Sequence, residues 1–130
     1  MRTSDPRLLD RPRLQQRITE EVERSRRHRH TFGLLLFEAV SGADGMPLRT
    51  KLQAALGAME SVVRTSDVIS RPYEDMLAVL LVETDAAGTR DALMRIRRRI
   101  ADRAGTWRVT VLSYPEHART IAAMAFLDAL

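Results

Sequence analysis

The feature that most constrains the fold is the apolar run Phe-Gly-Leu-Leu-Leu-Phe at residues 32–37, which ends at Glu38. The run is far too short to span a membrane, but it has the length of a β-strand that is buried on both faces. A strand of this kind lies at the centre of a sheet that has helices packed against it. The run therefore predicts an α/β domain.

Length and composition set the limits of that domain. With 130 residues, 45% of them hydrophobic, the chain can build one domain around one core. No cysteine is present, which excludes disulfides, a thiolate nucleophile and a cysteine-based zinc site. We expect a cytoplasmic protein with no membrane insertion, a flexible N-terminal arm over residues 1–12 and a single domain over residues 13–130.

The charge of the chain is +4, and Lys51 is its one lysine, so arginine carries almost all of the positive charge. Arginine forks suit phosphate and carboxylate groups, but the same bias arises wherever a GC-rich genome replaces lysine by arginine. We favour the compositional explanation. The cluster from Arg24 to His30 is accordingly interpreted as a solvated helix face.

Apolar residues at helical spacing predict four helices. The first has a thin stripe of Leu14, Ile18 and Val22, so it either packs lightly on the domain or pairs with a copy of itself. Thr84 or Asp85 is expected to cap the third. The predicted ranges are 13–28, 48–64 with Pro47 at its start, and 117–130, and the third helix holds Leu93, Ile96 and Ile100.

Three further runs read as strands, at residues 67–71, 76–82 and 107–112. The first two are separated by Pro72-Tyr73-Glu74-Asp75, which predicts a hairpin turn. After the first helix the order is strand, helix, strand, strand, helix, strand, helix. This is the split arrangement of ferredoxin-like sheets, and it predicts about four strands with antiparallel pairs, flanked by helices.

The hairpin also carries a family resemblance. Residues 64–81 resemble, at matching spacing, the R-x-x-D-x-x-x-R-x-G-G-D-E-F stretch of GGDEF (diguanylate cyclase) domains and the apolar strand after it. The resemblance implies a nucleotide-cyclase-like fold. Tyr73, Glu74 and Asp75 stand at the first three positions of the signature, and only Asp75 keeps the family's residue type.

The resemblance implies a catalytically inactive relative. In the family the two glycines let the turn approach the triphosphate of GTP, whereas a ring at Tyr73 and a negative charge at Glu74 oppose such a ligand. The segment from Glu38 to Arg64 is also shorter than the family's and lacks its Phe-Lys pair and guanine-recognising Asn and Asp. We therefore expect a pseudo-enzyme.

Two carboxylates match the family's metal-binding positions. Glu38 follows the buried strand and Asp75 is the third residue of the signature, so a hard cation such as Mg²⁺ is chemically compatible with them. A carboxylate at a strand end is more often simply solvated, and our expectation is that the domain has no cofactor.

The R-x-x-D stretch matches the family's inhibitory site, which binds cyclic di-GMP. The resemblance implies that Arg64 and Asp67 contact this ligand and that Arg95, on the next helix, is the secondary arginine. An arginine fork clamps guanine or phosphate, and a carboxylate accepts from guanine N–H groups. The alternative is an Arg64–Asp67 pair that merely closes the corner between helix and strand.

Three functions remain open from the sequence. The first is a non-catalytic signalling domain that binds cyclic di-GMP, and the second is a protein-docking or dimerisation module without a nucleotide. Nucleic-acid binding through 24–30 and 95–99 ranks third, because few aromatic residues are free to stack on bases. No histidine has the spacing of a catalytic triad or of a metal site, and the sequence around Ser113 is not that of a nucleophile elbow. Another kind of enzyme is therefore not expected.

Overall fold

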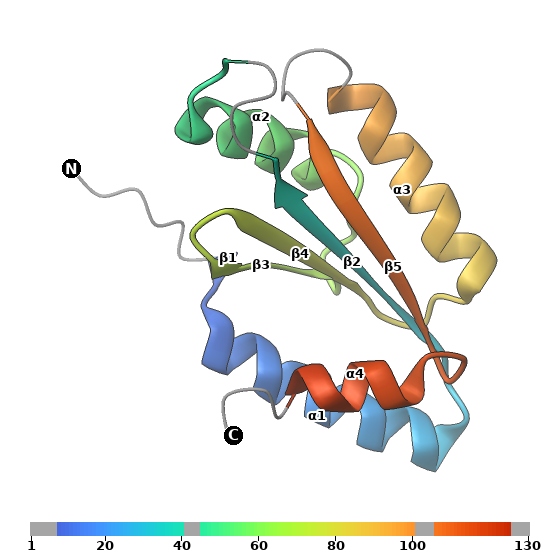
Figure 1. Ribbon diagram of the computed structural model, residues 1–130. Coiled ribbons are helices and arrows are strands. Elements are labelled where there is room, and N and C mark those ends of the chain that lie inside the picture. Colours follow the sequence, from blue (N-terminus) through green and yellow to red (C-terminus); the bar gives the residue numbers. More distant parts are fainter. Residues whose placement is uncertain (1–7, 41–44, 101–105, 126–130) are drawn as a thin grey trace.

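The computed structural model describes residues 8–40, 45–100 and 106–125. Within them, one five-stranded sheet has the order β1-β3-β4-β2-β5, and four helices lie on its two faces (Figure 1). The strands are β1 (Leu8–Leu9), β2 (Phe32–Ala39), β3 (Val68–Tyr73), β4 (Met76–Leu81) and β5 (Trp107–Tyr114). The helices are α1 (Arg11–His28), α2 (Leu48–Glu60), α3 (Ala86–Ile100) and α4 (Ala118–Ala125). The predicted α/β class is confirmed.

The central strand is the one that the apolar run predicted. β2 lies between β4 and β5 and pairs with both in antiparallel register, so that Leu35 is opposite Val79 on one side and Val111 on the other. Leu34 and Leu35 are both fully buried. Because successive side chains of a strand point to opposite faces, these neighbours enter two different cores.

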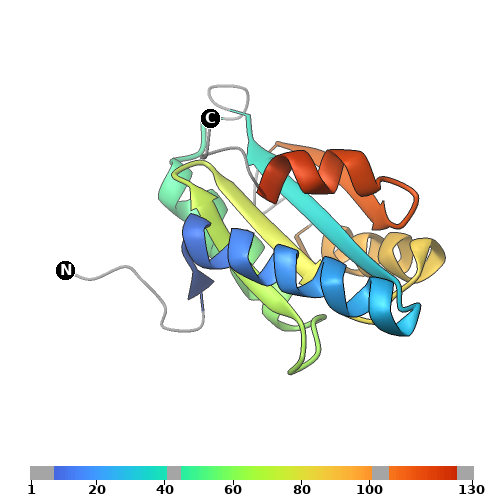
Figure 2. The same cartoon turned by 90° about the horizontal axis from the view of Figure 1, so that it is seen from below.

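The two cores lie on opposite faces of the sheet. Figure 2 shows α1 and α4 side by side on one face, where Ile18 and Ile121 are buried against β2 and β4. On the other face α2 and α3 bury Met59 and Ile96. No helix among the described residues combines the length and apolar character needed to cross a membrane.

The N-terminal boundary corrects the sequence prediction. The prediction of a flexible arm over residues 1–12 is wrong for residues 8–12, which form β1 and the start of α1. Residues 1–7 lie outside the described residues. Leu8 and Leu9 form β1, which pairs parallel with Ile69 and Ser70. A two-residue strand has no periodicity to recognise, and tertiary pairing alone defines it. α1 then begins at Arg11, because proline is tolerated in a first turn and the Asp10 side chain accepts a hydrogen bond from Arg13 N at 3.1 Å.

Other boundaries differ by a few residues. α2 ends at Glu60 rather than 64, and the hairpin turn contains only Glu74 and Asp75, because β3 continues to Tyr73. Of the two candidate caps of α3, Asp85 takes the role, since its Oδ1 accepts from Gly88 N at 2.8 Å. β5 extends beyond the predicted 107–112 to Tyr114. Residues 126–130 of the predicted last helix lie outside the described residues.

Candidate ligand groove and signature hairpin

Asp67 organises the corner between α2 and β3. Its side chain is only 2% exposed, and its two carboxylate oxygens accept four hydrogen bonds. Three come from Arg64, from the backbone N (2.9 Å), Nε (3.3 Å) and Nη2 (3.2 Å), and one comes from Val82 N (3.1 Å). The carboxylate therefore ties the end of α2 to the end of β4.

Arg64 lies above this carboxylate with its side chain 56% exposed. Its Nη2 also donates to the carbonyl of Val82 and to Thr84 Oγ1, at 2.5 and 2.9 Å. Nη1 makes none of the hydrogen bonds that hold the corner. The guanidinium is thus fixed in place while one of its nitrogens faces outwards. In this arrangement Asp67 positions Arg64, and its own acceptor sites are already used.

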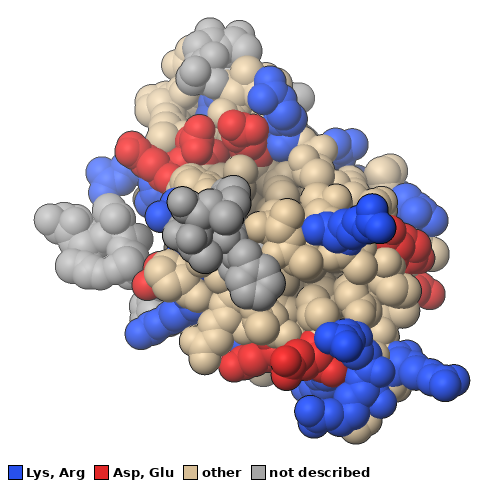
Figure 3. Space-filling view, turned by 60° about the horizontal axis from the view of Figure 1, so that its bottom comes forward, with Lys and Arg blue, Asp and Glu red and all other residues tan. Residues whose placement is uncertain are grey.

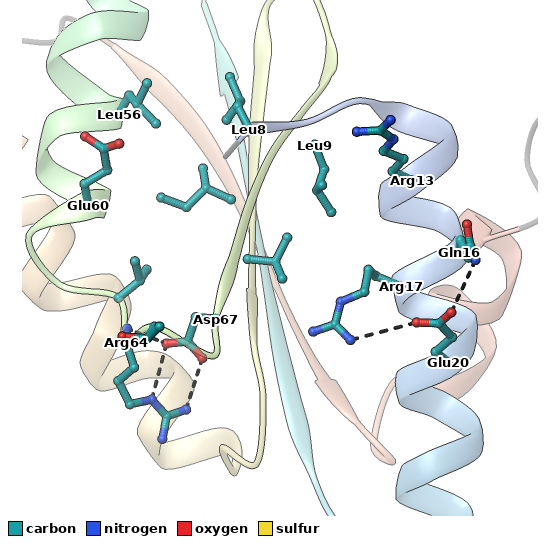
Figure 4. A pocket seen from close by; sticks show the side chains of 14 residues that line it. Leu8, Leu9, Arg13, Gln16, Arg17, Glu20, Leu56, Glu60, Arg64 and Asp67 are labelled. Carbon is teal, nitrogen blue, oxygen red and sulfur yellow. Dashed lines mark hydrogen bonds and ion pairs between the residues drawn. The ribbon is translucent and has the colours of Figure 1, made fainter. Parts of the chain in front are cut away.

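A groove of about 720 Å³ opens beside this corner. Figure 4 shows it between α1 and α2, at the edge of the sheet beside β3. Its apolar lining comes from β1, the end of α2 and the start of β3, namely Leu8, Leu9, Leu56, Val63, Val68 and Ile69. Arg64 stands on one wall, and Arg13 and Arg17 of α1 stand on the opposite wall. Glu60 of α2 also lines the groove, so its apolar surface is flanked on both sides by arginine together with acidic residues.

The acidic groups of the α1 wall are engaged within the helix. Glu20 accepts from Gln16 Nε2 at 3.3 Å and lies 3.9 Å from Arg17 Nη1. Arg17 also approaches the buried Glu21 at 3.6 Å. The structure thus places Arg13 and Arg17, four residues apart on α1, across the groove from Arg64. Helical spacing marks their common face in the sequence, but nothing local shows that this face meets Arg64.

Arg95 lies elsewhere. It is 62% exposed on α3 and pairs with Asp91 one turn earlier, with Nε and Oδ2 3.1 Å apart. It does not line the groove, and no hydrogen bond or ion pair among the described residues joins it to Arg64 or Asp67. Of the three residues predicted to bind the ligand, the structure therefore brings together Arg64 and Asp67 but not Arg95.

The signature hairpin, residues 73–77, contains no glycine. Tyr73 ends β3, is 37% exposed, and has the Arg11 guanidinium 4.8 Å from its ring centroid. The carbonyl of Glu74 accepts from Arg71 Nε and Nη2 at 3.2 and 2.7 Å. Among the described non-glycine residues, positive φ occurs at Arg29 and Glu83 and not in this turn. The turn therefore needs no glycine in the left-handed region.

Of the two candidate metal carboxylates, Glu38 lies near the end of β2 and Asp75 lies in the turn between β3 and β4. Ala39 N donates to the Asp75 carbonyl at 2.8 Å, which sets Glu38 and Asp75 at adjacent positions along the strand ends. The carboxylate of Glu38 lies 3.5 Å from Arg108 Nη1 on β5. No group of three or more His, Asp or Glu within 8–40, 45–100 and 106–125 has a metal-binding arrangement. Glu38 thus faces a cation of the protein.

The arginine clusters do not form one surface. Arg24 is paired with Glu21 and Glu83, at 3.8 and 3.2 Å. The C-terminal end of α1, with residues 24–30, and the C-terminal end of α3, with residues 95–99, lie at opposite ends of the sheet (Figure 1). On the face shown in Figure 3, basic and acidic side chains adjoin one another rather than forming a basic stripe.

Comparison with known proteins identifies the fold. No protein-family model and no curated protein matches the sequence. Among solved structures, a DGC protein from Thermotoga maritima superposes with a TM-score of 0.76 at 17% identity, covering 95% of both chains. The diguanylate cyclase SiaD from Pseudomonas aeruginosa, solved with its activator SiaC, gives 0.66 at 27% identity, covering 96% of this chain and 56% of SiaD.

A third structure carries a ligand. The GGDEF domain of DgcB from Caulobacter crescentus, in complex with c-di-GMP, superposes with a TM-score of 0.67 at 13% identity, covering 99% of this chain and 92% of that domain. These similarities agree with the α/β class and the element order that the sequence predicted after α1. The chain is therefore a GGDEF-like domain with the nucleotide-cyclase-like fold.

Proposed function

We propose that this protein is a cytoplasmic, non-catalytic GGDEF-like signalling domain that binds cyclic di-GMP in the groove beside Arg64. The observation that carries the proposal is the placement of a fixed, exposed Arg64 on one wall of a groove of about 720 Å³. Sites for small molecules are concave, largely apolar, and roughly 300–1,000 Å³ in volume. The groove is concave and has a volume in this range, and its lining combines apolar with charged side chains.

The chemistry of the groove suits a cyclic dinucleotide. Flat purine rings bury apolar area against side chains such as Leu9 and Val68, and phosphate groups accept from arginine forks. Arg64 supplies its outward nitrogen and the face of its guanidinium, while Arg13 and Arg17 face it from α1. Asp67 acts as a positioning residue, because its four hydrogen bonds fix Arg64.

Several features support the absence of catalysis. Tyr73 and Glu74 put bulk and negative charge where the family's glycines approach the triphosphate of GTP. Glu38 lies against Arg108, whose charge competes with that of Mg²⁺ for the carboxylate. We therefore propose a domain without a metal cofactor that forms no cyclic di-GMP from GTP.

The test is calorimetric titration of the full chain with cyclic di-GMP, using Arg64→Ala and, as a matched control, Arg95→Ala. Both substitutions remove an exposed arginine that pairs with an aspartate, but only Arg64 lines the groove. We expect saturable binding that weakens at least tenfold in Arg64→Ala and stays within twofold in Arg95→Ala. Incubation with GTP and Mg²⁺ should yield no cyclic dinucleotide.

Two outcomes would count against the proposal. Absence of heat with cyclic di-GMP would leave the second function, a protein-docking or dimerisation module, in its place. Binding that Arg95→Ala weakens as much as Arg64→Ala would place the ligand outside the groove. Thermal unfolding of each variant controls for loss of fold.

The docking alternative has one observation of its own in its favour. Asp67 is saturated by hydrogen bonds from the protein, as the corner-closing interpretation of this pair predicts. A protein partner, or a second copy, would use the same fold without any nucleotide. Nucleic-acid binding remains third, because the two arginine clusters lie at opposite ends of the sheet.

A further inference from the structure

We propose that the outer edge of β5 docks an extended, acidic strand of a partner protein, which adds a sixth strand to the sheet. The inference is independent of nucleotide binding, since β5 lies at the far edge of the sheet from the groove beside β1 and β3. It is carried by the backbone hydrogen bonds of β5, by the side chains along it, and by the charges that flank it.

The backbone of β5 has free groups at alternate residues. Val40 N donates to Thr106 O at 3.1 Å, and these two residues are directly opposite in the antiparallel register of β2 and β5. In such a ladder every second pair exchanges hydrogen bonds, so Arg108, Thr110 and Leu112 also bond to β2. The N–H and C=O groups of the residues between them point away from the sheet. They belong to Trp107, Val109, Val111 and Ser113.

One end of this edge is closed by the protein itself. Ser113 N donates to His117 Nδ1 at 2.9 Å, and the Ser113 carbonyl accepts from His117 N at 2.7 Å. No corresponding hydrogen bond is present at Trp107, Val109 or Val111 within the part of the chain that the structure describes. The edge therefore offers three consecutive outward residues to an added strand and stops at Ser113.

A strand edge of this length, unpaired within the described part of the chain, is unusual. Proteins generally shorten or cover exposed strand edges, because a row of free N–H and C=O groups pairs with other chains. The opposite edge of this sheet is formed by the two-residue β1, whereas β5 has eight residues. The outward residues also carry half-buried apolar side chains that join the α2–α3 core. An added strand with alternating apolar residues would extend that core.

Three arginines lie beside the edge, two on one face of the sheet and one on the other. On α3, Thr89, Leu93 and Ile96 face the sheet, and Ala92 joins the core on the α2 side. At about 100° per residue, Arg90 and Arg97 then project from the other flank, above the β5 edge. Neither has an ion-pair partner among the described residues. On the opposite face Arg108 is 71% exposed.

These charges select an acidic strand over a second copy of the chain. Two β5 strands paired edge to edge would bring the Arg90 and Arg97 flanks of two α3 helices together, and like charges on neighbouring helices repel. The net charge of +4 opposes self-association further. In an added strand whose apolar residues extend the α2–α3 core, glutamate or aspartate at the alternate positions points to the opposite face and meets the exposed Arg108.

The test uses a ten-residue peptide of alternating valine and glutamate, added to the ¹⁵N-labelled full chain. We expect saturable binding, with slowed amide exchange at Trp107, Val109 and Val111 and no change at Arg108 or Thr110. Val109→Pro removes an outward N–H but no bond to β2, and proline is tolerated at such edge positions. It should weaken binding at least tenfold, whereas Val109→Ala, which keeps the N–H, should weaken it less than threefold.

Charge and oligomeric state provide the remaining tests. A valine–lysine peptide should bind at least tenfold more weakly than the valine–glutamate peptide, and Arg108→Glu should remove that preference. The proposal is overturned if the acidic peptide does not bind, or if it binds without protecting the three outward amides. A dimer in sedimentation whose free chains already protect those amides would make a second copy the occupant and would also overturn it.

Discussion

At the residue scale, Asp67 occupies a position of the R-x-x-D motif and also holds the corner between α2 and β3 together through its hydrogen bonds. The R-x-x-D spacing suggests a ligand contact, yet both carboxylate oxygens are occupied by Arg64 and Val82. The aspartate is buried and the arginine is half exposed. Removal of the aspartate and removal of the arginine should therefore lower the free energy of unfolding by different amounts.

We expect Asp67→Ala to lower the free energy of unfolding by about 1–3 kcal/mol, because it leaves Val82 N and Arg64 N without acceptors. Arg64→Ala should cost less than Asp67→Ala, because the Asp67 carboxylate keeps its hydrogen bonds from the backbone N–H groups of residue 64 and Val82. Urea unfolding of both variants measures the difference. A larger loss in Arg64→Ala than in Asp67→Ala would show that the Arg64 side chain, not the hydrogen bonds from the backbone N–H groups, stabilises the corner.

Gly33 gives a second prediction at this scale. A Cβ at this position on β2 would lie 1.9 Å from Thr89 Oγ1, so α3 packs directly against the glycine. Gly33→Ala should destabilise by about 1–3 kcal/mol through overpacking. Gly57→Ala is the control, because a Cβ there meets nothing within 4 Å; it should stabilise α2 by about 0.5–1 kcal/mol. Equal unfolding midpoints for the two variants would contradict this account.

At the scale of the elements, the ends of helices and strands are fixed by interactions that the periodic pattern does not reveal. α1 ends at His28, and the C-cap residue Arg29 adopts a left-handed conformation with φ 57° and ψ 39°; the N–H of Arg29 donates to the Ser25 carbonyl. His30 N bonds to the same carbonyl at 3.1 Å. The left-handed residue is usually glycine, because a Cβ is strained there.

Arg29→Gly should therefore raise the free energy of unfolding by up to about 1 kcal/mol, with α1 otherwise unchanged. Arg27→Gly serves as the contrast: it lies inside α1, where glycine costs about 1 kcal/mol relative to a good helix former. Thermal melts followed by circular dichroism report both shifts. A lower melting temperature for Arg29→Gly would mean that its side chain, rather than backbone strain, dominates at this cap.

At the scale of the whole molecule, the sheet divides one domain into two cores. Ile18 is buried under α1 on one face and Ile96 under α3 on the other, at 1% and 0% exposure. β2 contributes alternate residues to both, so neither core is complete without the same strand. The two faces should unfold together.

Ile18→Val and Ile96→Val should each cost about 0.5–1.5 kcal/mol, and the double variant should equal their sum within about 0.5 kcal/mol, because the side chains share no partner. Denaturant curves from tryptophan fluorescence at Trp107 and from far-ultraviolet circular dichroism should coincide. Separate transitions from the two probes would indicate that the faces unfold independently.

The sequence by itself determined the features that depend on local pattern. Six consecutive apolar residues specify a strand buried on both faces, helical spacing specifies which side of α2 and α3 is buried, and the 64–81 stretch specifies the family likeness. Each of these is encoded within one segment of chain. The α/β class and the order of elements after α1 could therefore be predicted.

Only the tertiary structure decided the rest. β1 exists because Leu8 and Leu9 pair with β3, some sixty residues away, and Asp67 is saturated because Val82 comes from another strand. For the same reason Arg13 and Arg17, rather than Arg95, face Arg64 across the groove. The physical cause is common to all three. Hydrogen bonds and charges act through space, so partners that are distant in sequence leave no periodic signal within either segment.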